Sequence, residues 1–158
     1  MSAPSSMAAP EGFKEFQAAG GLFDLVGPIY ARVLDGEAHL GFRVEGKHLN
    51  PVGICHGGML ATLVDVQLGF GAAVAMKRRG FYPTINLNCD FLAPARPGQW
   101  VQGRTELIKA TPRMVFANAV LTADGEVVLR ANGIMKIPSD KDPRFQRPEG
   151  ATDPTKMT

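Results

Sequence analysis

One long segment, residues 57–79, predicts a helix that is apolar on every side. Up to Met76 it contains a single charged side chain, Asp65. A helix without a polar face is a buried helix, so the rest of the chain has to enclose it. Basic residues at 77–79 suit the negative end of the helix dipole, and Gly80 suits the position just beyond the helix end.

The remaining chain shows the patterns of strands. In residues 84–91 apolar and polar side chains alternate strictly, which places Ile85 on the same face as Leu87. Asp35-Gly36 and Asp124-Gly125 favour the tight turns of hairpins. Strands in runs around one long helix indicate an α+β fold, in which an antiparallel sheet wraps the central helix. The expected order is a short helix that ends at Gly20-Gly21, two strands, the long helix and four strands, over residues 11–19, 30–34, 37–44, 57–79, 84–91, 100–108, 114–122 and 126–137.

The ends of the chain differ in composition from its middle. Residues 1–10 are rich in Ser, Ala and Pro, and residues 138–158 combine four prolines with many charges. We therefore expect a disordered leader over 1–10, one folded domain over 11–137 and a flexible tail over 138–158. The leader lacks the basic and apolar regions of a secretory signal, and no apolar run reaches the roughly 18 residues of a membrane span.

The charge balance excludes some classes of partner. Seventeen Lys and Arg against 15 Asp and Glu give a net charge of +2, which is too small for binding nucleic acid or a membrane surface through bulk charge. Two cysteines, Cys55 and Cys89, cannot form a disulfide framework and fit a reducing compartment. We expect a cytoplasmic protein without nucleic-acid or membrane partners.

Asp65 is the first candidate for chemistry. A lone carboxylate in an apolar helix is costly unless it is paired or lines a cavity. A structural Asp bonded to nearby backbone and a catalytic Asp are equally consistent with the pattern.

The helix start, His56-Gly57-Gly58, is the second candidate. Glycines there let a ligand approach the free N–H groups, which favour negative charge such as the oxyanion of an attacked carbonyl. The alternative is that the glycines only permit tight packing or a sharp turn.

The spacing of the two candidates predicts a dimer. Gly57 and Asp65 are eight residues apart, which is about 12 Å along a helix and about 80° around it. One carbonyl cannot contact both groups of the same helix. If both act together, each site combines the helix start of one protomer with the Asp of the other, as in a symmetric dimer.

Two stretches carry a family resemblance. HLNPVGICHGGM over residues 48–59, followed by Asp65 and then TINLNCDFLAPA over residues 84–95, resembles the hotdog-fold acyl-CoA thioesterases, most of all their phenylacetic-acid-degradation branch. The resemblance covers roughly residues 25–137. It implies a hotdog fold that forms a homodimer or homotetramer and hydrolyses an acyl-CoA to the free acid and CoA.

The resemblance also implies catalytic roles. The Gly57 N–H polarises the thioester carbonyl, and Asp65 of the opposite protomer acts as base or nucleophile. Asn50 positions the catalytic water or the carbonyl. Thr84 lies near the water, and His56 orients the loop or contacts the thioester.

Further residues are expected to bind substrate. Gly58 and Asn86 belong to this group, and Lys109, Arg113 and Arg96 in strand-end loops could meet the phosphates of CoA. Each of these cations is also consistent with ordinary solvated charge.

No cofactor is expected, and two other functions are consistent with the same residues. CoA enters as part of the substrate, and the three histidines lack the spacing of metal ligands, so no metal is expected. A non-catalytic acyl-CoA binding module and, with less support, a hotdog acyl-CoA hydratase are the alternatives.

Overall fold

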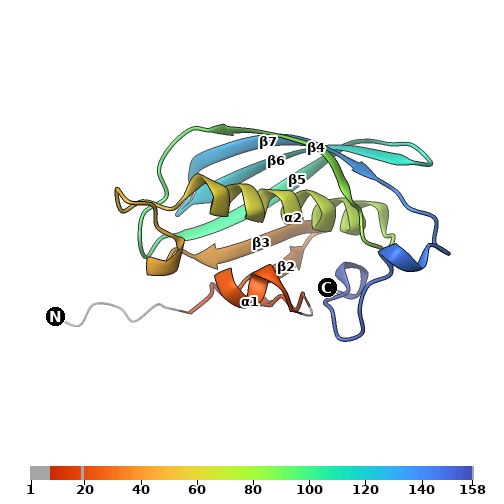
Figure 1. Cartoon of the computed structure of the whole chain (residues 1–158), viewed down its shortest axis with the longest axis horizontal. Helices are drawn as coiled ribbons and strands as arrows, with labels where there is room; N and C mark the ends of the chain where they lie inside the picture. The colour runs from red at the N-terminus through yellow and green to blue at the C-terminus, as the bar shows by residue number, and fades with distance from the viewer. Residues whose placement is uncertain (1–7, 19, 158) are drawn as a thin grey trace.

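A seven-stranded antiparallel sheet curves around one long helix (Figure 1). The computed structural model describes residues 8–18 and 20–157. Its elements are β1 (Lys14–Glu15), α1 (Leu22–Val26), β2 (Tyr30–Leu34), β3 (Glu37–Arg43), η1 (Gly46–His48), α2 (Gly57–Met76), β4 (Thr84–Phe91), β5 (Trp100–Ala110), β6 (Met114–Ala123), β7 (Glu126–Lys136), η2 (Pro143–Phe145) and η3 (Pro154–Lys156). The strand order is β1-β2-β3-β5-β6-β7-β4, so β4 forms one edge. The predicted α+β fold, a sheet wrapped around one central helix, is confirmed.

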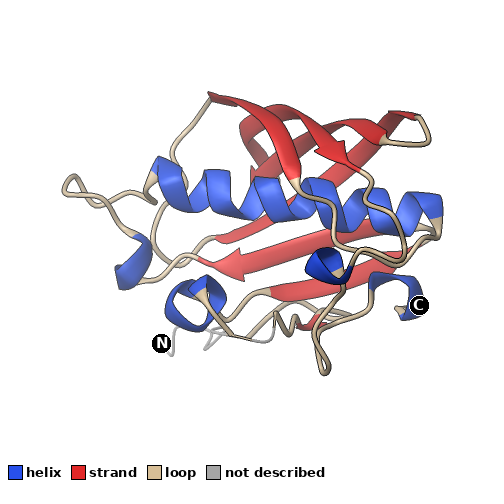
Figure 2. Cartoon of the chain, turned by 45° about the vertical axis from the view of Figure 1, so that its right-hand side comes forward, coloured by secondary structure: helices blue, strands red, loops and turns tan. Residues whose placement is uncertain are grey.

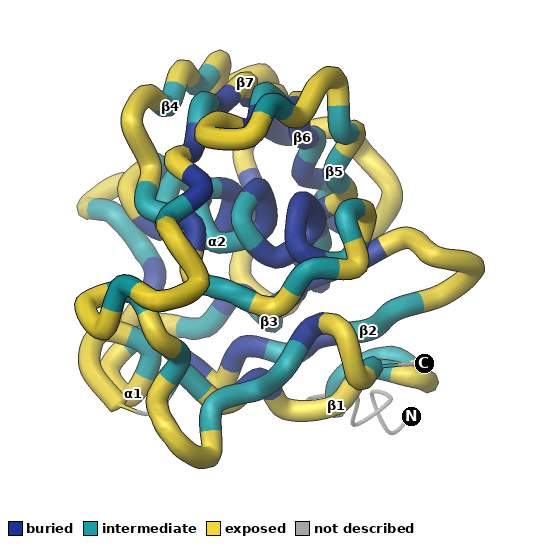
Figure 3. The backbone as a smooth tube through the Cα atoms, turned by 90° about the vertical axis from the view of Figure 1, so that its right-hand side faces the viewer, coloured by how far each residue is buried: buried dark blue, intermediate teal, exposed yellow. Residues whose placement is uncertain are grey.

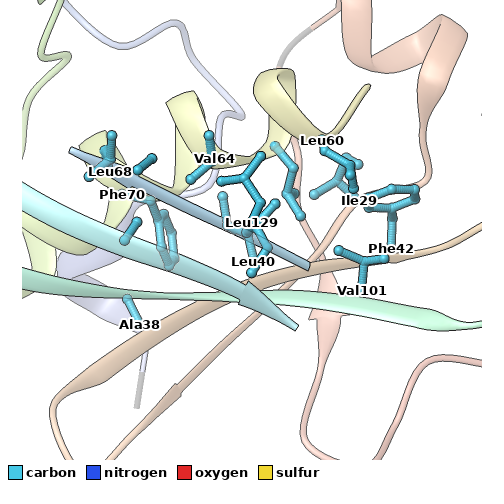
Figure 4. Packing of buried hydrophobic residues seen from close by; sticks show 14 of the residues in the cluster. Ile29, Ala38, Leu40, Phe42, Leu60, Val64, Leu68, Phe70, Val101 and Leu129 are labelled. Carbon is cyan, nitrogen blue, oxygen red and sulfur yellow. The ribbon is translucent and has the colours of Figure 1, made fainter. Parts of the chain in front are cut away.

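The core lies between α2 and the concave face of the sheet (Figure 2). Leu60, Val64 and Leu68 of α2 point toward Phe42 and Leu129 of the sheet (Figure 4), and all five side chains are buried. Burial of these apolar surfaces is the main force that holds the helix in the sheet.

The apolar character of α2 corrects one expectation from the sequence. An 18-residue window of α2 has a mean hydropathy of 1.6, so by length and composition the helix could cross a membrane. The expectation that no apolar run is long enough for a membrane span is therefore wrong. In the structure, 56% of that window is buried. Figure 3 shows α2 largely in the colour of buried residues, so the helix is the core of this fold.

Both predicted hairpin turns are confirmed. Asp35 and Gly36 have φ of 52° and 78°, and Asp124 and Gly125 have φ of 46° and 90°. Positive φ at both central residues matches the twist of the flanking strands.

The predicted helix over residues 11–19 is wrong. β1 pairs with β2 in this segment, and the Phe16 N–H donates to the Ile29 carbonyl at 2.7 Å. The Phe16 side chain is buried edge-to-face against Phe23 and Phe70. The glycines at 20–21 precede the short helix α1 instead of ending one. Apolar residues three apart therefore lie in an extended segment here, because pairing with β2 provides the hydrogen bonds of the backbone.

The end of α2 is displaced from its predicted place. The helix ends at Met76, three residues before the predicted end at 79, and Lys77 takes the left-handed conformation with φ 51°. Gly80 therefore lies beyond the cap instead of forming it.

The C-terminal segment is anchored to the end of α2. The sequence predicts a flexible tail over 138–158 with few apolar anchors. In the structure Pro154 is buried, and Met157 packs against the core. Figure 1 shows this segment in blue beside the end of α2. Its flexibility stays a prediction, and residues 1–7 of the predicted leader lie outside the described residues.

Candidate active site

Asp65 and Thr84 meet on the inner side of the sheet. Asp65 is half-buried on α2, and the Thr84 hydroxyl donates to its Oδ1 at 2.6 Å. Asp65 therefore has a side-chain partner on β4, which supplies the pairing that a lone carboxylate in an apolar helix requires.

A β-bulge brings Thr84 to this position. In the pairing with β7 the register shifts between Thr84 and Asn86, so Ile85 is an extra residue. Strict alternation predicts Thr84 on the face opposite Leu87 and Ile85 beside Leu87. The bulge reverses this: Thr84 shares the inner face with Leu87, and Ile85 is 57% exposed.

The start of α2 offers one free backbone donor. His56 caps the helix, since its Nδ1 accepts from the Gly58 N–H at 2.9 Å. The Gly57 N–H, in contrast, has no acceptor among the described residues. Of the two predicted donors, only Gly57 is open to a ligand. The expected role of His56 in orienting this loop agrees with the bond, whereas the substrate role of Gly58 stays a prediction.

Asn50 places a side-chain amide in the same cavity as Gly57. Its Oδ1 accepts from the N–H groups of Val52 at 3.1 Å and Ile54 at 3.3 Å, which fixes the loop. The amide NH₂ is therefore left as the free end of the side chain. Asn50 and Gly57 line the same cavity of about 420 Å³, together with Phe91.

The Phe91 ring lies close to Gly57. A Cβ at this position would lie 3.2 Å from Cε1 of Phe91. The sequence marks Gly57 through its place at the helix start, but it does not reveal that Phe91 at the end of β4 lines the same cavity.

The two halves of the candidate site lie apart in one chain. Asp65 and Thr84 mark the start of β4, whereas Gly57 lies beside Phe91 at the other end of the strand. This separation agrees with the distance of about 12 Å along the helix axis.

The other predicted substrate residues are dispersed. Asn86 lies on the outer face of the sheet and accepts through its Oδ1 from Asn88, so it does not join Asp65. Lys109 and Arg113 are exposed at the turn between β5 and β6. This turn is at the Thr84 end of the sheet, since the Arg113 carbonyl accepts from the Ile137 N–H at the end of β7.

Arg96 belongs to the opposite end of the sheet. It is exposed in the loop after β4, and the neighbouring Ala95 carbonyl accepts from the Cys55 N–H near the helix start. Within one chain, Arg96 therefore does not cluster with Lys109 and Arg113.

Neither cysteine has the character of an activated nucleophile. Burial raises the pKa of the Cys55 thiol to about 11. Partial burial, and then the charge of Asp65, raises the pKa of Cys89. Within residues 8–18 and 20–157, no group of three or more His, Cys, Asp or Glu side chains could hold a metal.

Gln67 of α2 is a buried structural residue that the sequence pattern did not single out. Its fully buried Oε1 accepts from the Leu40 N–H at 2.7 Å, and its Nε2 donates to the Ala38 carbonyl and to Thr105 Oγ1 at 2.8 and 2.9 Å. The side chain thus serves a stretch of β3 that β5 leaves unpaired. A second polar residue within an apolar helix is the signal that would have identified it.

Known proteins share the sequence pattern of this chain. Residues 52–129 match the model of the Thioesterase superfamily. The Pseudomonas aeruginosa protein named "Putative esterase PA0474" is 37% identical over 134 residues, which cover 84% of this chain and 99% of that protein. Human acyl-coenzyme A thioesterase 13 is 29% identical over 91 residues, which cover 58% of this chain and 64% of the human one.

Solved structures share the fold. Zebrafish thioesterase superfamily member 2 superposes with a TM-score of 0.66 at 21% identity, covering 76% of this chain and 88% of its own. The smu.793 protein of Streptococcus mutans, solved bound to acetyl CoA, gives 0.64 at 19% identity, covering 72% of this chain and 90% of its own. At this identity the likeness establishes the architecture alone.

Proposed function

Because this chain belongs to the hotdog-fold thioesterases of the Thioesterase superfamily, we propose that it hydrolyses an acyl-CoA to the free acid and CoA. The observation that carries the proposal is the division of polar groups along β4. A carboxylate with its hydroxyl partner lies at one end, and a free N–H with a free amide lies at the other.

A symmetric dimer through β4 would unite these halves. β4 is an edge strand, and its exposed apolar residues are Ile85 and Phe91, with Leu92 directly after them. An open edge with apolar side chains is suited to pairing with a second strand. Antiparallel pairing about a two-fold axis near the strand centre sets the Thr84 end of one protomer against the Phe91 end of its partner. Each dimer then has two sites.

The chemistry divides between the two protomers. The thioester oxygen accepts from the Gly57 N–H and the Asn50 amide, which stabilise the negative charge that develops there. Asp65 of the other protomer takes a proton from water, whose oxygen attacks the carbonyl carbon. Alternatively the Asp65 carboxylate attacks that carbon itself, and after loss of CoA water hydrolyses the resulting anhydride to the free acid and Asp65. Collapse of the tetrahedral intermediate breaks the C–S bond and releases CoA, whose sulfur takes up a proton. Thr84 holds the carboxylate in place.

The same pairing gives the dispersed cations a shared role. Arg96 of one protomer would approach the partner's end of the sheet that carries Lys109 and Arg113. We propose these three for the CoA phosphates, and CoA as part of the substrate instead of a separate cofactor. Cys55 and Cys89 are both free, which supports a cytoplasmic location within this proposal.

Free-thiol release from a panel of aromatic and straight-chain acyl-CoAs tests the activity. We expect turnover by the wild type and a loss of at least a hundredfold in kcat for Asp65→Asn. The matched control is Glu106→Gln, an exposed carboxylate on β5, which should keep wild-type turnover.

The alternatives predict different results in the same assay. Tight, saturable binding of acyl-CoA without thiol release would favour the binding module. Water addition to an enoyl-CoA, with no free thiol, would favour the hydratase.

A further inference from the structure

A second cavity lies between the end of α2 and the C-terminal segment. Its volume is about 360 Å³, within the range of roughly 300–1,000 Å³ that small-molecule sites occupy. It is separate from the cavity at the helix start, and none of the residues assigned above to the thioester chemistry lines it. Charged and aromatic side chains among its lining residues are Arg78, Arg79, Phe81, Asp140, Phe145 and Arg147.

The C-terminal wall of this cavity is held in place by specific bonds. Arg147 Nε donates to the Gly80 carbonyl at 3.0 Å, and Nη1 donates to the Thr152 carbonyl at 2.9 Å. Thr152 Oγ1 in turn accepts from the Gln17 N–H at 2.7 Å, and Pro154 is buried. The segment therefore forms a defined wall beside α2.

Positive charge exceeds negative charge at this cavity. Three arginines line it, against one carboxylate, Asp140, which is paired with Arg78 at 2.7 Å. Arg79 lies 3.4 Å from Asp153. Arg147 donates only to carbonyl oxygens and forms no ion pair within the described part of the chain. The charge of Asp153 acts on Arg147 from nearby, but Nη2 of Arg147 has no acceptor among the described residues, so an anion could accept a hydrogen bond there.

Two aromatic rings stand beside these cations. Phe81 and Phe145 are parallel within 3°, with centroids 6.4 Å apart, and Phe81 is 53% exposed. Lys136 Nζ lies 5.9 Å from the centre of the Phe145 ring. Phe145 is half-buried, and the Arg144 guanidinium also lies 5.4 Å from the centre of its ring. The exposed Phe81 ring, stacked on Phe145 beside these cations, is suited to a flat base that carries phosphate, since bases stack on aromatic side chains.

The position of this cavity connects it with the candidate active site. Phe81 precedes Thr84 by three residues, which is at most about 10 Å along the backbone. On the other side, Pro138 of the cavity follows Ile137, which is bonded to the turn that carries Arg113. The cavity thus adjoins both the hydroxyl end of β4 and the cations proposed for the CoA phosphates.

We propose that this cavity binds an adenine nucleotide, with the base stacked on Phe81 and Phe145 and a phosphate at Arg147. The nucleotide end of the acyl-CoA substrate and a free adenine nucleotide share this chemistry. The first source rests on the proposed function, whereas binding itself does not.

Calorimetry with adenosine 3′,5′-bisphosphate tests the binding. We expect saturable binding by the wild-type protein and roughly tenfold weaker binding by Phe145→Leu, which keeps an apolar side chain but loses the stacking face. Arg147→Gln should weaken binding as well, while Phe145→Tyr should retain it. The charge control is Lys156→Gln, which removes one cation from the same segment outside the cavity and should bind as the wild type does.

Comparison of acyl-CoA with the matching acyl-pantetheine identifies the source of the nucleotide. If the substrate supplies it, the ratio of the two kcat/KM values exceeds one in the wild type and falls toward one in Phe145→Leu and Arg147→Gln. If the bisphosphate binds but the variants leave that ratio unchanged, the site takes a free nucleotide. Absence of bisphosphate binding to the wild type overturns the proposal. Absence of hydrolysis of either thioester would refute the proposed function and leave the calorimetry valid.

Discussion

At the scale of single residues, the orientation of Asp65 depends on one hydroxyl. Thr84→Val keeps the shape of the side chain but removes the donor at 2.6 Å. A hydrogen bond to a charged group contributes about 1.5–3 kcal/mol, so we expect kcat to fall roughly tenfold to a hundredfold. Steady-state kinetics with Thr84→Ser as the control, which restores the hydroxyl, check this. Equal kcat for the Val and Ser variants would remove Thr84 from the mechanism.

Gln67 acts on stability instead of chemistry. Gln67→Leu leaves the Leu40 N–H and the Ala38 carbonyl without their partner inside the protein. Each unsatisfied buried group costs about 1–3 kcal/mol. We expect a loss of roughly 2–6 kcal/mol in the free energy of unfolding.

Urea unfolding at one fixed protein concentration, followed through the fluorescence of Trp100, measures this loss. Trp100 is the single tryptophan of the chain. Gln17→Leu, at an exposed position, is the control and should unfold as the wild type does. An unchanged midpoint for Gln67→Leu would show that β3 finds other partners.

At the scale of elements, β4 is predicted to join two protomers. Ile85→Lys places a charge on each copy of the exposed edge, so we expect weaker association and a parallel loss of activity. Ile108→Lys is a close match, since Ile85 and Ile108 are 57% and 54% exposed, and it should leave association unchanged. Sedimentation velocity combined with thiol release checks both. An intact, active dimer of Ile85→Lys would rule out pairing through this edge.

The sequence predicts those elements whose signals are local. Both Asp-Gly turns, the bounds of β4 and the apolar helix depend on neighbouring residues and are confirmed within a few residues. The segment at 11–19 fails because its pairing with β2 is decided by residues beyond it. The bulge at Ile85 is likewise invisible, since strict alternation and a shifted register fit the same letters.

The candidate site was predictable to a similar extent. The motif around Asn50, Gly57 and Asp65 identified residues that line a cavity or gain a partner. Asn86 was predicted to bind substrate, but it lies on the outer face of β4 with Asn88, away from Asp65. The wall formed by Arg147 was missed because its bonds go to carbonyl oxygens, which leave no mark in the side-chain pattern.

At the scale of the whole molecule, activity is predicted to belong to the pair of chains. Asp65→Asn and Asn50→Ala each disable one half of every site, so either homodimer should be nearly inactive. In a mixed dimer, one site combines both altered residues and the other has neither. We therefore expect co-expression to restore about half of the wild-type turnover per mixed dimer.

Mixed dimers isolated with two different affinity tags allow this measurement. The control is each variant co-expressed with itself and purified in the same way. Purified mixed dimers that remain inactive would mean that Asp65 and Asn50 act within one chain or not at all.

The extra residue in β4 has a consequence for how such a protein could change over generations. The pairing of β4 with β7 after Asn86 does not require Ile85. Deletion of this one residue would remove the bulge and keep Thr84 opposite Met135, with its hydroxyl still on the inner face. A single three-nucleotide deletion could thus take one exposed apolar side chain from the edge of the sheet, and descendants of such an event would keep both the fold and the hydroxyl that holds Asp65.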